Sequence, residues 1–433
     1  HKHLVLQKLN EKSAVVAIIG LGYVGLQLAL MYSESGYNVI GIDNDQSKIQ
    51  KLNSGKSFLK HIPSKRVSSA CKQGVVFTLE TELTKADVII LCLPTPLNKN
   101  KEPDLSYLLS GVEEVKKSLR PGHVIAIEST TFPGTTREII VPILEESKLK
   151  LGTEFFVIYS PEREDPANTK FKSNQIPKII SGYSDKCLEV AKALFKGVFE
   201  TLVPVSTTDT AEFTKLHENI FRSINIAFVN EMKLIAGELN IDIFEVINAA
   251  STKPFGFSAF RPGPGLGGHC IPIDPCYLSW KVKEFNIPSK FIELSENINS
   301  SMPAYVNSKI TNALNSKKKA VNGSKILILG VSYKKNIEDT REAPAFPIIK
   351  QLLADGANVQ YCDPFVSSIT PCESGLNNLT SLNINSLSIE SYDIVVIITN
   401  HDRFNYDDIL QRSKLIVDTR GVFSMLDSKV FRA

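Results

Sequence analysis

The sequence lacks the features that mark several specialised classes of protein. None of its seven cysteines forms a CxxC pair, which argues against a zinc knot or a disulfide framework and favours a reducing cytoplasm. No apolar run approaches the roughly 18 residues that a membrane-spanning helix needs. The net charge is only +3, so neither nucleic acid nor an anionic membrane surface is implied as a partner.

What is present is the composition of an ordinary globular protein, with 43% hydrophobic residues in a chain of 433. That length is enough for two or three domains and a large core. The N-terminus has no signal-peptide pattern, and it begins with His1 rather than Met. We interpret His1-Lys2-His3 as a trimmed end or as residues added to the natural chain.

The chain begins with a pattern typical of a dinucleotide-binding fold. A short apolar strand, Val15–Ile19, leads into the glycine turn Gly20-Leu-Gly-Tyr-Val-Gly25 and then a helix over Leu26–Ser35. A second strand, Asn38–Ile42, closes on Asp43. Strand, glycine turn, helix, strand and acid in this order make the first unit of such a fold.

The glycine turn predicts where a cofactor binds. Gly20 permits the turn, Gly22 lets a pyrophosphate approach the backbone, and Gly25 lets the helix pack closely on the strand. The helix N-terminus adds N–H groups and a positive dipole end for the phosphates. Asp43 would accept hydrogen bonds from the adenosine ribose and repel a 2′-phosphate, which favours NAD over NADP. The alternative is that the glycines serve packing alone. The predicted cofactor site in this turn comprises Gly20, Gly22, Tyr23, Val24, Gly25 and Asp43.

Polar residues follow three further predicted strands. The strands are Val88–Leu93, Val124–Glu128 and Phe156–Tyr159. Their alternation with helical segments indicates a mostly parallel sheet covered on both faces. Open parallel sheets bind ligands at the carboxyl ends of their strands, so Thr/Pro turns that would mean little alone are expected to line the nicotinamide or the reacting carbon. These residues are Pro94, Thr95, Ser129 and Thr130, with Thr130 also assigned to catalysis.

Glu162 and Arg163 follow the strand Phe156–Tyr159. Glu162 is suited to positioning or activating a water molecule, and Arg163 is suited to contacting an anionic ligand. The alternative is a polar surface loop with no role in the chemistry.

A long segment without glycine or proline, Thr210–Ala236, carries apolar residues at helical spacing. It is too long for an average surface helix, so we interpret it as a spine that joins domains. Lys215 and Asn219 are four residues apart and share one face. A cation and an amide aimed at a forming alkoxide would explain this pair. The alternative for Lys215 is a side chain that extends to solvent.

The most informative segment is Pro262-Gly-Pro-Gly-Leu-Gly-Gly-His-Cys-Ile-Pro-Ile-Asp-Pro275. Its glycines can bring the backbone close to a ligand, because no Cβ stands in the way. The thiolate of Cys270 would be a good nucleophile there, and backbone N–H groups would steady a developing oxyanion. Asp274 places a carboxylate four residues after the cysteine. A buried structural cysteine in a tight turn is the alternative.

A second doubly wound unit is predicted after a lysine-rich linker near Asn315–Gly323. Its elements are the strand Lys325–Leu329, the helix Ala345–Leu353, the strand Val359–Cys362 ending at Asp363, and the strands Ile394–Thr399 and Leu415–Val417. Because this unit lacks the GxGxxG glycines, we expect it to bind a mononucleotide. Lys334 and Arg341 follow its first strand and Arg420 its last, and basic residues at strand ends would suit a diphosphate.

Together these patterns predict an α/β protein with two Rossmann-like doubly wound domains, joined by a long central helix and a small all-helical region. We expect an NAD-binding domain over residues 1–208, a central helical region with the cysteine loop over 209–315, and the second nucleotide-binding domain over 316–433.

Four pieces of sequence, taken in order, resemble the UDP-glucose/GDP-mannose dehydrogenase family over nearly the whole chain. They are the glycine turn at Gly20, Lys215-Leu-His-Glu-Asn219, Gly267-Gly-His-Cys270-Ile-Pro-Ile-Asp274, and Lys334 with Asp339-Thr-Arg341-Glu. Within the family, His269 and the phrase Arg261-Pro-Gly-Pro-Gly are similar to the branch that oxidises UDP-N-acetylhexosamines. The bacterial UDP-N-acetylglucosamine 6-dehydrogenases of O-antigen, lipopolysaccharide and capsule polysaccharide biosynthesis are nearest in pattern. Arg163 departs from the UDP-glucose enzymes, so their acidic pattern in that loop is not carried over beyond Glu162.

The resemblance implies two successive NAD-dependent oxidations of the C6 hydroxyl of UDP-GlcNAc, with no metal. Cys270 would attack the intermediate aldehyde, and Lys215 and Asn219 would stabilise the thiohemiacetal oxyanion. Water activated by Asp274 or Glu162 would release the acid from a thioester. Arg341 is assigned to the cofactor, and a homodimer on the spine helix, or a higher homo-oligomer, is implied. The implied substrate contacts are Glu162, Arg163, Lys215, Asn219, Arg261, Gly267, Lys334 and Arg420.

Three alternatives remain open at this stage. A UDP-N-acetylmannosamine or UDP-glucose 6-dehydrogenase would share the same catalytic residues. A hydroxyacid dehydrogenase would share the first domain and the long helix, but it would need neither the cysteine loop nor the second nucleotide domain. A non-catalytic nucleotide-sugar-binding protein would keep the fold, but it would not need Cys270, Lys215, Asn219 and Asp274 together.

Overall fold

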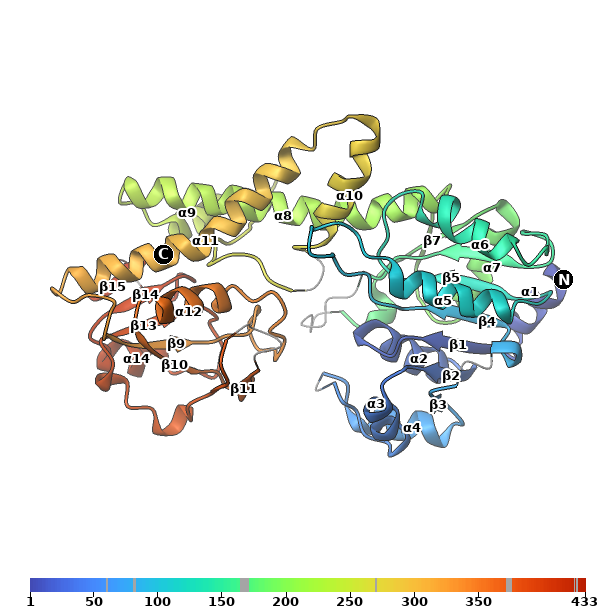
Figure 1. The fold of residues 1–433 in the computed structure, drawn as a ribbon, viewed down its shortest axis with the longest axis horizontal. Coiled ribbons are helices and arrows are strands. Elements are labelled where there is room, and N and C mark those ends of the chain that lie inside the picture. Colours follow the sequence, from blue (N-terminus) through green and yellow to red (C-terminus); the bar gives the residue numbers. More distant parts are fainter. Residues whose placement is uncertain are drawn as a thin grey trace. The chain divides into compact units, whose positions relative to one another are not determined.

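The computed structural model describes residues 1–59, 61–80, 83–163, 171–268, 271–370, 376–423, 425 and 427–433 (Figure 1). Contacts divide the chain into two compact units. The first comprises residues 1–218 and 276–285, and the second comprises residues 219–275 and 286–433. The domain boundaries expected at residues 208 and 315 stay a prediction.

The first unit is built on an eight-stranded sheet in the order β3-β2-β1-β4-β5-β6-β7-β8. Its strands are β1 Val15–Ile19, β2 Asn38–Ile42, β3 Val76–Thr78, β4 Val88–Leu91, β5 Val124–Ile127, β6 Phe156–Tyr159, β7 Lys178–Gly182 and β8 Leu202–Pro204. All neighbours are parallel except β6 and β7. The strand predicted at Val88–Leu93 ends earlier, because the Leu93 N–H bonds to the Ser129 hydroxyl instead of a neighbouring strand.

Helices cover both faces of this sheet. Its helices are α1 Lys2–Asn10, α2 Tyr23–Glu34, α3 Gln46–Asn53, α4 Ser64–Lys72, α5 Ser106–Lys117, α6 Val141–Glu145 and α7 Asp185–Lys196. The helices α1, α2 and α7 pack in one core with alternate residues of the strands, whereas α5 contacts β4 and α6. The central strands are apolar along their whole length because neither face meets water.

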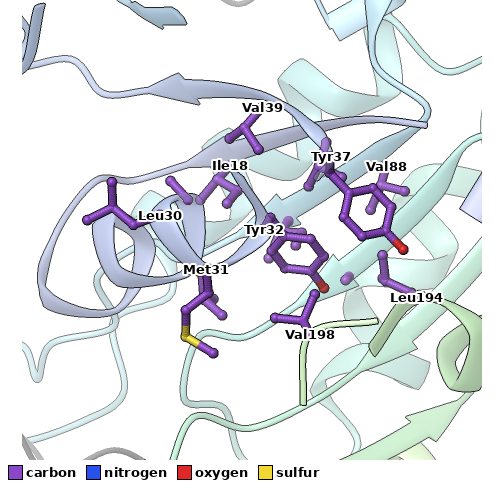
Figure 2. Close-up of a cluster of buried hydrophobic side chains, with 14 of the residues drawn as sticks. Ile18, Leu30, Met31, Tyr32, Tyr37, Val39, Val88, Leu194 and Val198 are labelled. Carbon is purple, nitrogen blue, oxygen red and sulfur yellow. The ribbon is translucent and has the colours of Figure 1, made fainter. Parts of the chain in front are cut away.

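The core between α2 and the sheet is dense in large side chains (Figure 2). Leu30, Met31 and Tyr32 of α2 pack beside Ile18 of β1 and Val88 of β4. Burial of each such side chain contributes about 1.5–3 kcal/mol. This core fixes α2, and with it the glycine turn at the start of that helix.

The middle of the chain is mostly helical, and two of its helices are long. They are α8 Thr208–Glu238, α9 Ile243–Ala250, α10 Asp274–Val282 and α11 Lys290–Asn315. The spine predicted at Thr210–Ala236 is confirmed and is slightly longer. Helix α11 continues through Pro303 to Asn315, where the predicted linker begins.

The second unit contains a five-stranded parallel sheet in the order β10-β9-β13-β14-β15. The strands are β9 Lys325–Leu329, β10 Asn358–Cys362, β13 Ile394–Ile397, β14 Ile416–Asp418 and β15 Val430–Arg432. Helix α11 and α12 Ala345–Ala354 cover one face, and α14 Tyr406–Arg412 covers the other. The strands β11 Ser368–Ile369 and β12 Leu379–Thr380 pair antiparallel and form a separate small sheet. The second doubly wound domain is therefore confirmed. In the part of the chain that the structure describes, no helix has both the length and the apolar character to cross a bilayer.

Candidate active site

The glycine turn between β1 and α2 has the geometry that a dinucleotide needs. Gly20 adopts φ +93°, and a Cβ there would lie 2.5 Å from the Cys92 carbonyl oxygen. A Cβ on Gly25 would lie 1.8 Å from the Gly20 carbonyl oxygen. A Cβ on Gly22 would meet no atom within 4 Å, so space for a ligand exists above that residue. Helix α2 starts at Tyr23 without a side-chain cap, which leaves its first N–H groups for an anion.

Asp43 ends β2 beside this turn. Its Oδ2 accepts the Leu21 N–H at 2.8 Å and its Oδ1 accepts the Asp45 N–H at 2.9 Å. The carboxylate is therefore held at the place where the dinucleotide fold puts the acid that binds the adenosine ribose. The strand order around β1 is also the one that Rossmann folds share. These residues fit NAD.

Two glycine variants separate folding from cofactor binding. We expect Gly22→Ala to keep the thermal midpoint of wild type, because the methyl group meets no protein atom, while the KM for NAD⁺ rises by about 10-fold or more because the pyrophosphate is kept away. Gly25→Ala is expected to unfold at a lower temperature, because helix and strand must separate. Thermal unfolding and NAD⁺ saturation curves measure both. Equal unfolding and equal NAD⁺ affinity for the two variants would contradict this assignment of roles.

Ser129 and Thr95 shape the loop that follows β4. The Ser129 hydroxyl accepts the Leu93 N–H at 2.9 Å and lies 2.8 Å from the Leu93 carbonyl oxygen, to which it can donate. The Thr95 carbonyl accepts the Tyr277 hydroxyl at 2.8 Å. Pro94 is exposed and Thr130 is half-buried beside this pair of strand ends. The structure thus brings the four predicted strand-end residues into one region of the first unit, with Ser129 bracing the loop.

Sequence reasoning missed a buried ion network behind Glu162. Lys178, at the start of β7, pairs with Glu128 and lies 3.3 Å from Glu162 Oε2. Burial, with the charge of Glu162, raises the pKa of Glu128 to about 7 against the opposing effect of Lys178. Burial alone lowers the pKa of Lys178, but Glu128 and Glu162 outweigh it, so that pKa is raised. Lys178 therefore stays charged and holds two carboxylates.

Lys215 and Arg163 are both held within the first unit. Lys215 is only 9% exposed, and its Nζ donates to the Glu162 carbonyl oxygen at 2.7 Å. The alternative interpretation, a lysine that extends to solvent, is wrong. Arg163 pairs with Glu218 at 2.6 Å and donates to the Pro177 carbonyl oxygen at 2.8 Å. Glu162 is thus contacted through its side chain by Lys178 and through its backbone by Lys215.

In the second unit, two of the predicted catalytic residues meet. Asn219 Nδ2 donates to Asp274 Oδ2 at 2.5 Å, and Asp274 is 2% exposed. Asp274 is the first residue of α10 instead of a loop residue. Helix α8 carries both Lys215 and Asn219, so their shared face is confirmed. Cys270 and His269 lie outside the described residues.

The glycine loop packs against the segment that follows β9. The Gly268 N–H donates to the Arg341 carbonyl oxygen at 2.9 Å. A Cβ on Gly267 would lie 2.5 Å from the Tyr333 Cβ, so only glycine permits this approach. The Arg341 side chain pairs with Asp339 at 2.6 Å. The predicted cofactor residue Arg341 therefore contacts Gly268, the residue after the predicted substrate residue Gly267.

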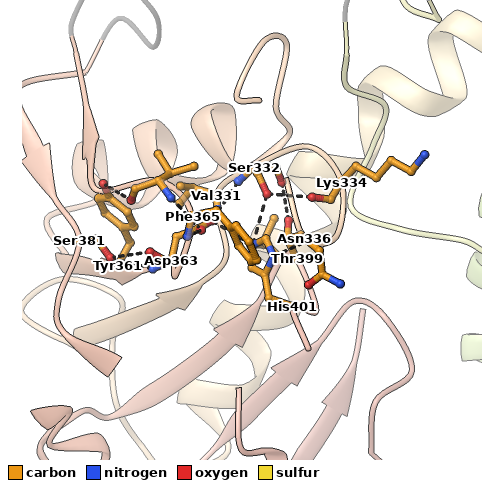
Figure 3. A network of polar contacts seen from close by, with 12 residues as sticks. Val331, Ser332, Lys334, Asn336, Tyr361, Asp363, Phe365, Ser381, Thr399 and His401 are labelled. Atoms are coloured by element: carbon orange, nitrogen blue, oxygen red, sulfur yellow. Dashed lines mark hydrogen bonds and ion pairs between the residues drawn. The ribbon is translucent and has the colours of Figure 1, made fainter. Parts of the chain in front are cut away.

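A second missed network fixes the loop that carries Lys334 (Figure 3). Asp363 Oδ2 accepts the Val331 N–H at 2.7 Å and lies 3.1 Å from His401 Nε2. His401 Nδ1 accepts the Asn336 N–H at 2.9 Å, so Nε2 carries the proton in a neutral ring. Burial raises the pKa of Asp363, but His401 and the backbone donors outweigh it and the pKa is lowered. The half-buried Lys334 thus projects from a fixed loop.

The two remaining predicted substrate residues differ in their surroundings. Arg261 is exposed and donates to Asn248 Oδ1 at 2.6 Å. Arg420 follows β14 and donates through Nε to the Ile398 carbonyl oxygen at 2.7 Å.

The fold and the site define a class of protein: a dinucleotide-dependent dehydrogenase with a second, shorter nucleotide-binding domain. Comparison with known families agrees. The NAD binding domain of the UDP-glucose/GDP-mannose dehydrogenase family matches residues 14–199, the central domain 209–301, and the UDP binding domain 327–425. The chain belongs to the UDP-glucose/GDP-mannose dehydrogenase family, and it is an NAD-dependent UDP-sugar dehydrogenase. The family, the fold class and the cofactor predicted from the sequence are confirmed.

Individual relatives agree over nearly their full length. UDP-N-acetyl-D-mannosamine dehydrogenase from Methanococcus maripaludis is 34% identical over 94% of this chain and 92% of its own. UDP-N-acetyl-D-glucosamine 6-dehydrogenase from Pseudomonas aeruginosa is 33% identical over 91% and 92%. The solved UDP-D-ManNAc dehydrogenase from Pyrococcus horikoshii is 31% identical, with a TM-score of 0.86 over 96% of this chain and 98% of that one.

Proposed function

We propose that this protein oxidises the C6 hydroxyl of UDP-N-acetyl-D-mannosamine to the uronic acid in two NAD-dependent steps. The sequence alone favoured the glucosamine epimer, but the relatives favour the mannosamine epimer, since the archaeal proteins from Methanococcus, Methanocaldococcus and Pyrococcus are all named for it. The Pseudomonas relative keeps UDP-GlcNAc as the second candidate. We further propose a role in capsule-type polysaccharide synthesis; one relative, from Staphylococcus aureus at 32% identity, bears the name Protein CapL.

The observation that supports the four-electron chemistry is the contact of half-buried Asn219 with buried Asp274, which follows the cysteine loop in sequence. A buried carboxylate that accepts an amide hydrogen bond is placed to accept a proton from water. An enzyme that stopped at the aldehyde would need neither this acid nor Cys270.

The proposed reaction uses the side chains as follows. NAD⁺, when bound, would supply the hydride acceptor for each oxidation, and the hydroxyl proton lost in each step would pass to solvent. Cys270 Sγ adds to the aldehyde carbon, and the thiol proton ends on the former aldehyde oxygen. The ammonium of Lys215 and the amide of Asn219 stabilise that oxygen as its charge develops. After the second oxidation water attacks the thioester carbon, the C–S bond breaks, and Asp274 or Glu162 takes the proton of the water while the thiolate leaves.

The experiment that tests this function is a parallel measurement of NADH at 340 nm with limiting UDP-ManNAc, UDP-GlcNAc and UDP-glucose. We expect about two NADH per UDP-ManNAc and a kcat/KM at least about 10-fold higher than for the other two sugars. A yield near one would show that the aldehyde is released and would contradict the thioester. Faster turnover of UDP-GlcNAc would establish the second candidate instead.

We also propose that the protein is a homodimer formed through α8. Four large apolar side chains, spaced seven or eight residues apart along this helix, are exposed: Phe213 at 45%, Phe221 at 51%, Phe228 at 53% and Ile235 at 48%. A stripe of this kind is costly in water and is typical of an interface. We expect Phe228→Glu to shift the sedimentation mass from dimer toward monomer, whereas Glu145→Ala at an exposed residue of α6 leaves it unchanged. A monomeric wild type would contradict the proposal.

A further inference from the structure

Two side chains of α8 hold one glycine of the cysteine loop by both of its backbone groups. Asn230 Oδ1 accepts the Gly263 N–H at 3.0 Å, and Lys233 Nζ donates to the Gly263 carbonyl oxygen at 2.9 Å. Both side chains are buried, and Asn230 Nδ2 also donates to Asn299 Oδ1 of α11 at 3.0 Å. The glycine loop is therefore anchored to the two long helices in the second unit.

Lys233 lies in a cluster of positive charge. A Cβ on Gly263 would lie 2.6 Å from Arg420 Nη1, so the Arg420 guanidinium rests on the glycine that Lys233 holds. Lys233 Nζ and Lys309 Nζ each lie 5.1 Å from the centroid of the Tyr305 ring. We name Lys233, Lys309 and Arg420 the cationic cluster.

No acid of the described second unit neutralises this cluster by an ion pair. Asp418 lies closest in sequence to Arg420 and accepts its backbone N–H at 2.9 Å, but the Asp418 side chain pairs with Arg432 at 2.6 Å. Besides the Gly263 carbonyl, Lys233 contacts the Tyr305 ring, and the charges of Arg420 and Lys309 lie near it. An unpaired buried cation is costly, so this cluster is suited to an anion.

The charge of Lys233 is correspondingly easy to lose. Burial, together with the charges of Arg420 and Lys309, lowers the pKa of Lys233 to about 7. Burial also lowers the pKa of Arg420 to about 10, with Asp418 acting in the opposite direction. An anion near the cluster would favour the protonated amine and raise the pKa of Lys233 again.

We propose that Lys233 is a positioning residue for the diphosphate of the nucleotide sugar, acting through Gly263 and Arg420, and that it takes up one proton from solvent when the diphosphate binds. This inference rests on the proposed function, because it requires Arg420 to contact the UDP moiety. It assigns a role to a lysine that the sequence presents as one more polar residue of the spine helix.

The test is calorimetric titration of UDP into the full-length protein at pH 8, in two buffers with different ionisation enthalpies. We expect wild type to take up about one proton per UDP and Lys233→Met to take up almost none. UDP affinity of wild type should fall by about 10-fold between pH 7 and pH 8.5, because the amine is then increasingly neutral, whereas Lys233→Met should show a flat profile over that range. UDP itself stays fully ionised over most of this range, since its terminal phosphate titrates at about pH 6.

Two further variants serve as controls for the assignment of the proton uptake to Lys233. Lys233→Arg keeps a cation that does not lose its proton, so it should bind UDP with a flat pH profile. Lys350→Met makes the same substitution at an exposed lysine of α12 and should retain the proton uptake of wild type. UDP binding by wild type without proton uptake, or uptake that persists in Lys233→Met, would overturn the inference and leave the proposed function standing. A wild type that does not bind UDP would overturn both.

Discussion

Replacing Cys270 with serine is expected to abolish net formation of the uronic acid, with a loss of turnover on the order of 10³-fold or more. A hydroxyl at this position is a poor nucleophile at neutral pH, whereas a thiol is partly ionised and intrinsically reactive. The NADH yield should therefore fall to one per UDP-sugar or less. The measurement is NADH formation over long incubation with UDP-ManNAc, with quantification of the acid.

NAD binding should survive this change, because the glycine turn and Asp43 belong to the first unit and Cys270 does not. Fluorescence titration with NADH would show this directly. Cys71→Ser is the matched control: Cys71 lies on α4 with its Sγ 3.4 Å from the Leu52 carbonyl oxygen, and the variant should turn over normally. Normal acid formation by Cys270→Ser would contradict the thioester mechanism.

The parts of the site that could be predicted from the sequence are those with a local cause. The glycine turn, Asp43 and the pair Lys215 and Asn219 are each set by a spacing within one element or one turn. Four strands of the second Rossmann-like domain could be predicted for a similar reason, since β9, β13 and β14 are short apolar runs and β10 ends before Asp363, whereas β15 was not predicted.

The parts that were missed depend on the order of strands and helices in space. Glu128 and Lys178 are 50 residues apart in sequence. They meet because β7 is antiparallel to β6, so that the start of β7 lies at the carboxyl edge of the parallel strands. Lys233 and Gly263 are 30 residues apart and meet because the glycine loop packs on α8. Helix α11 passes through Pro303, a residue that ordinarily marks a helix end, because its apolar face is buried against the second sheet.

The network behind Glu162 predicts the largest effect on stability. We expect Lys178→Met to destabilise the protein by about 3–5 kcal/mol, because Glu128 would be left buried with no opposite charge. The lost cation–π contact with Phe199, at 5.3 Å, is worth only about 0.5–2 kcal/mol, so the uncompensated carboxylate decides the result. Thermal and urea unfolding measure the loss.

Three comparisons make this prediction specific. Glu128→Gln in the Lys178→Met background should recover most of the stability, since it removes the buried charge while it keeps the shape. Lys117→Met breaks an exposed pair with Glu114 and should cost only about 0–1 kcal/mol.

The pH dependence of the effect of Lys178→Met has a definite sign. The folded-state pKa of Glu128 is already raised to about 7 in wild type, above its unfolded value, and loss of Lys178 raises it further. The free energy of unfolding therefore falls as pH rises from the unfolded-state pKa of Glu128 to its folded-state pKa. The stability of Lys178→Met should be closer to that of wild type at pH 5 than at pH 8. A variant equally destabilised at both pH values would show that Lys178 acts through packing.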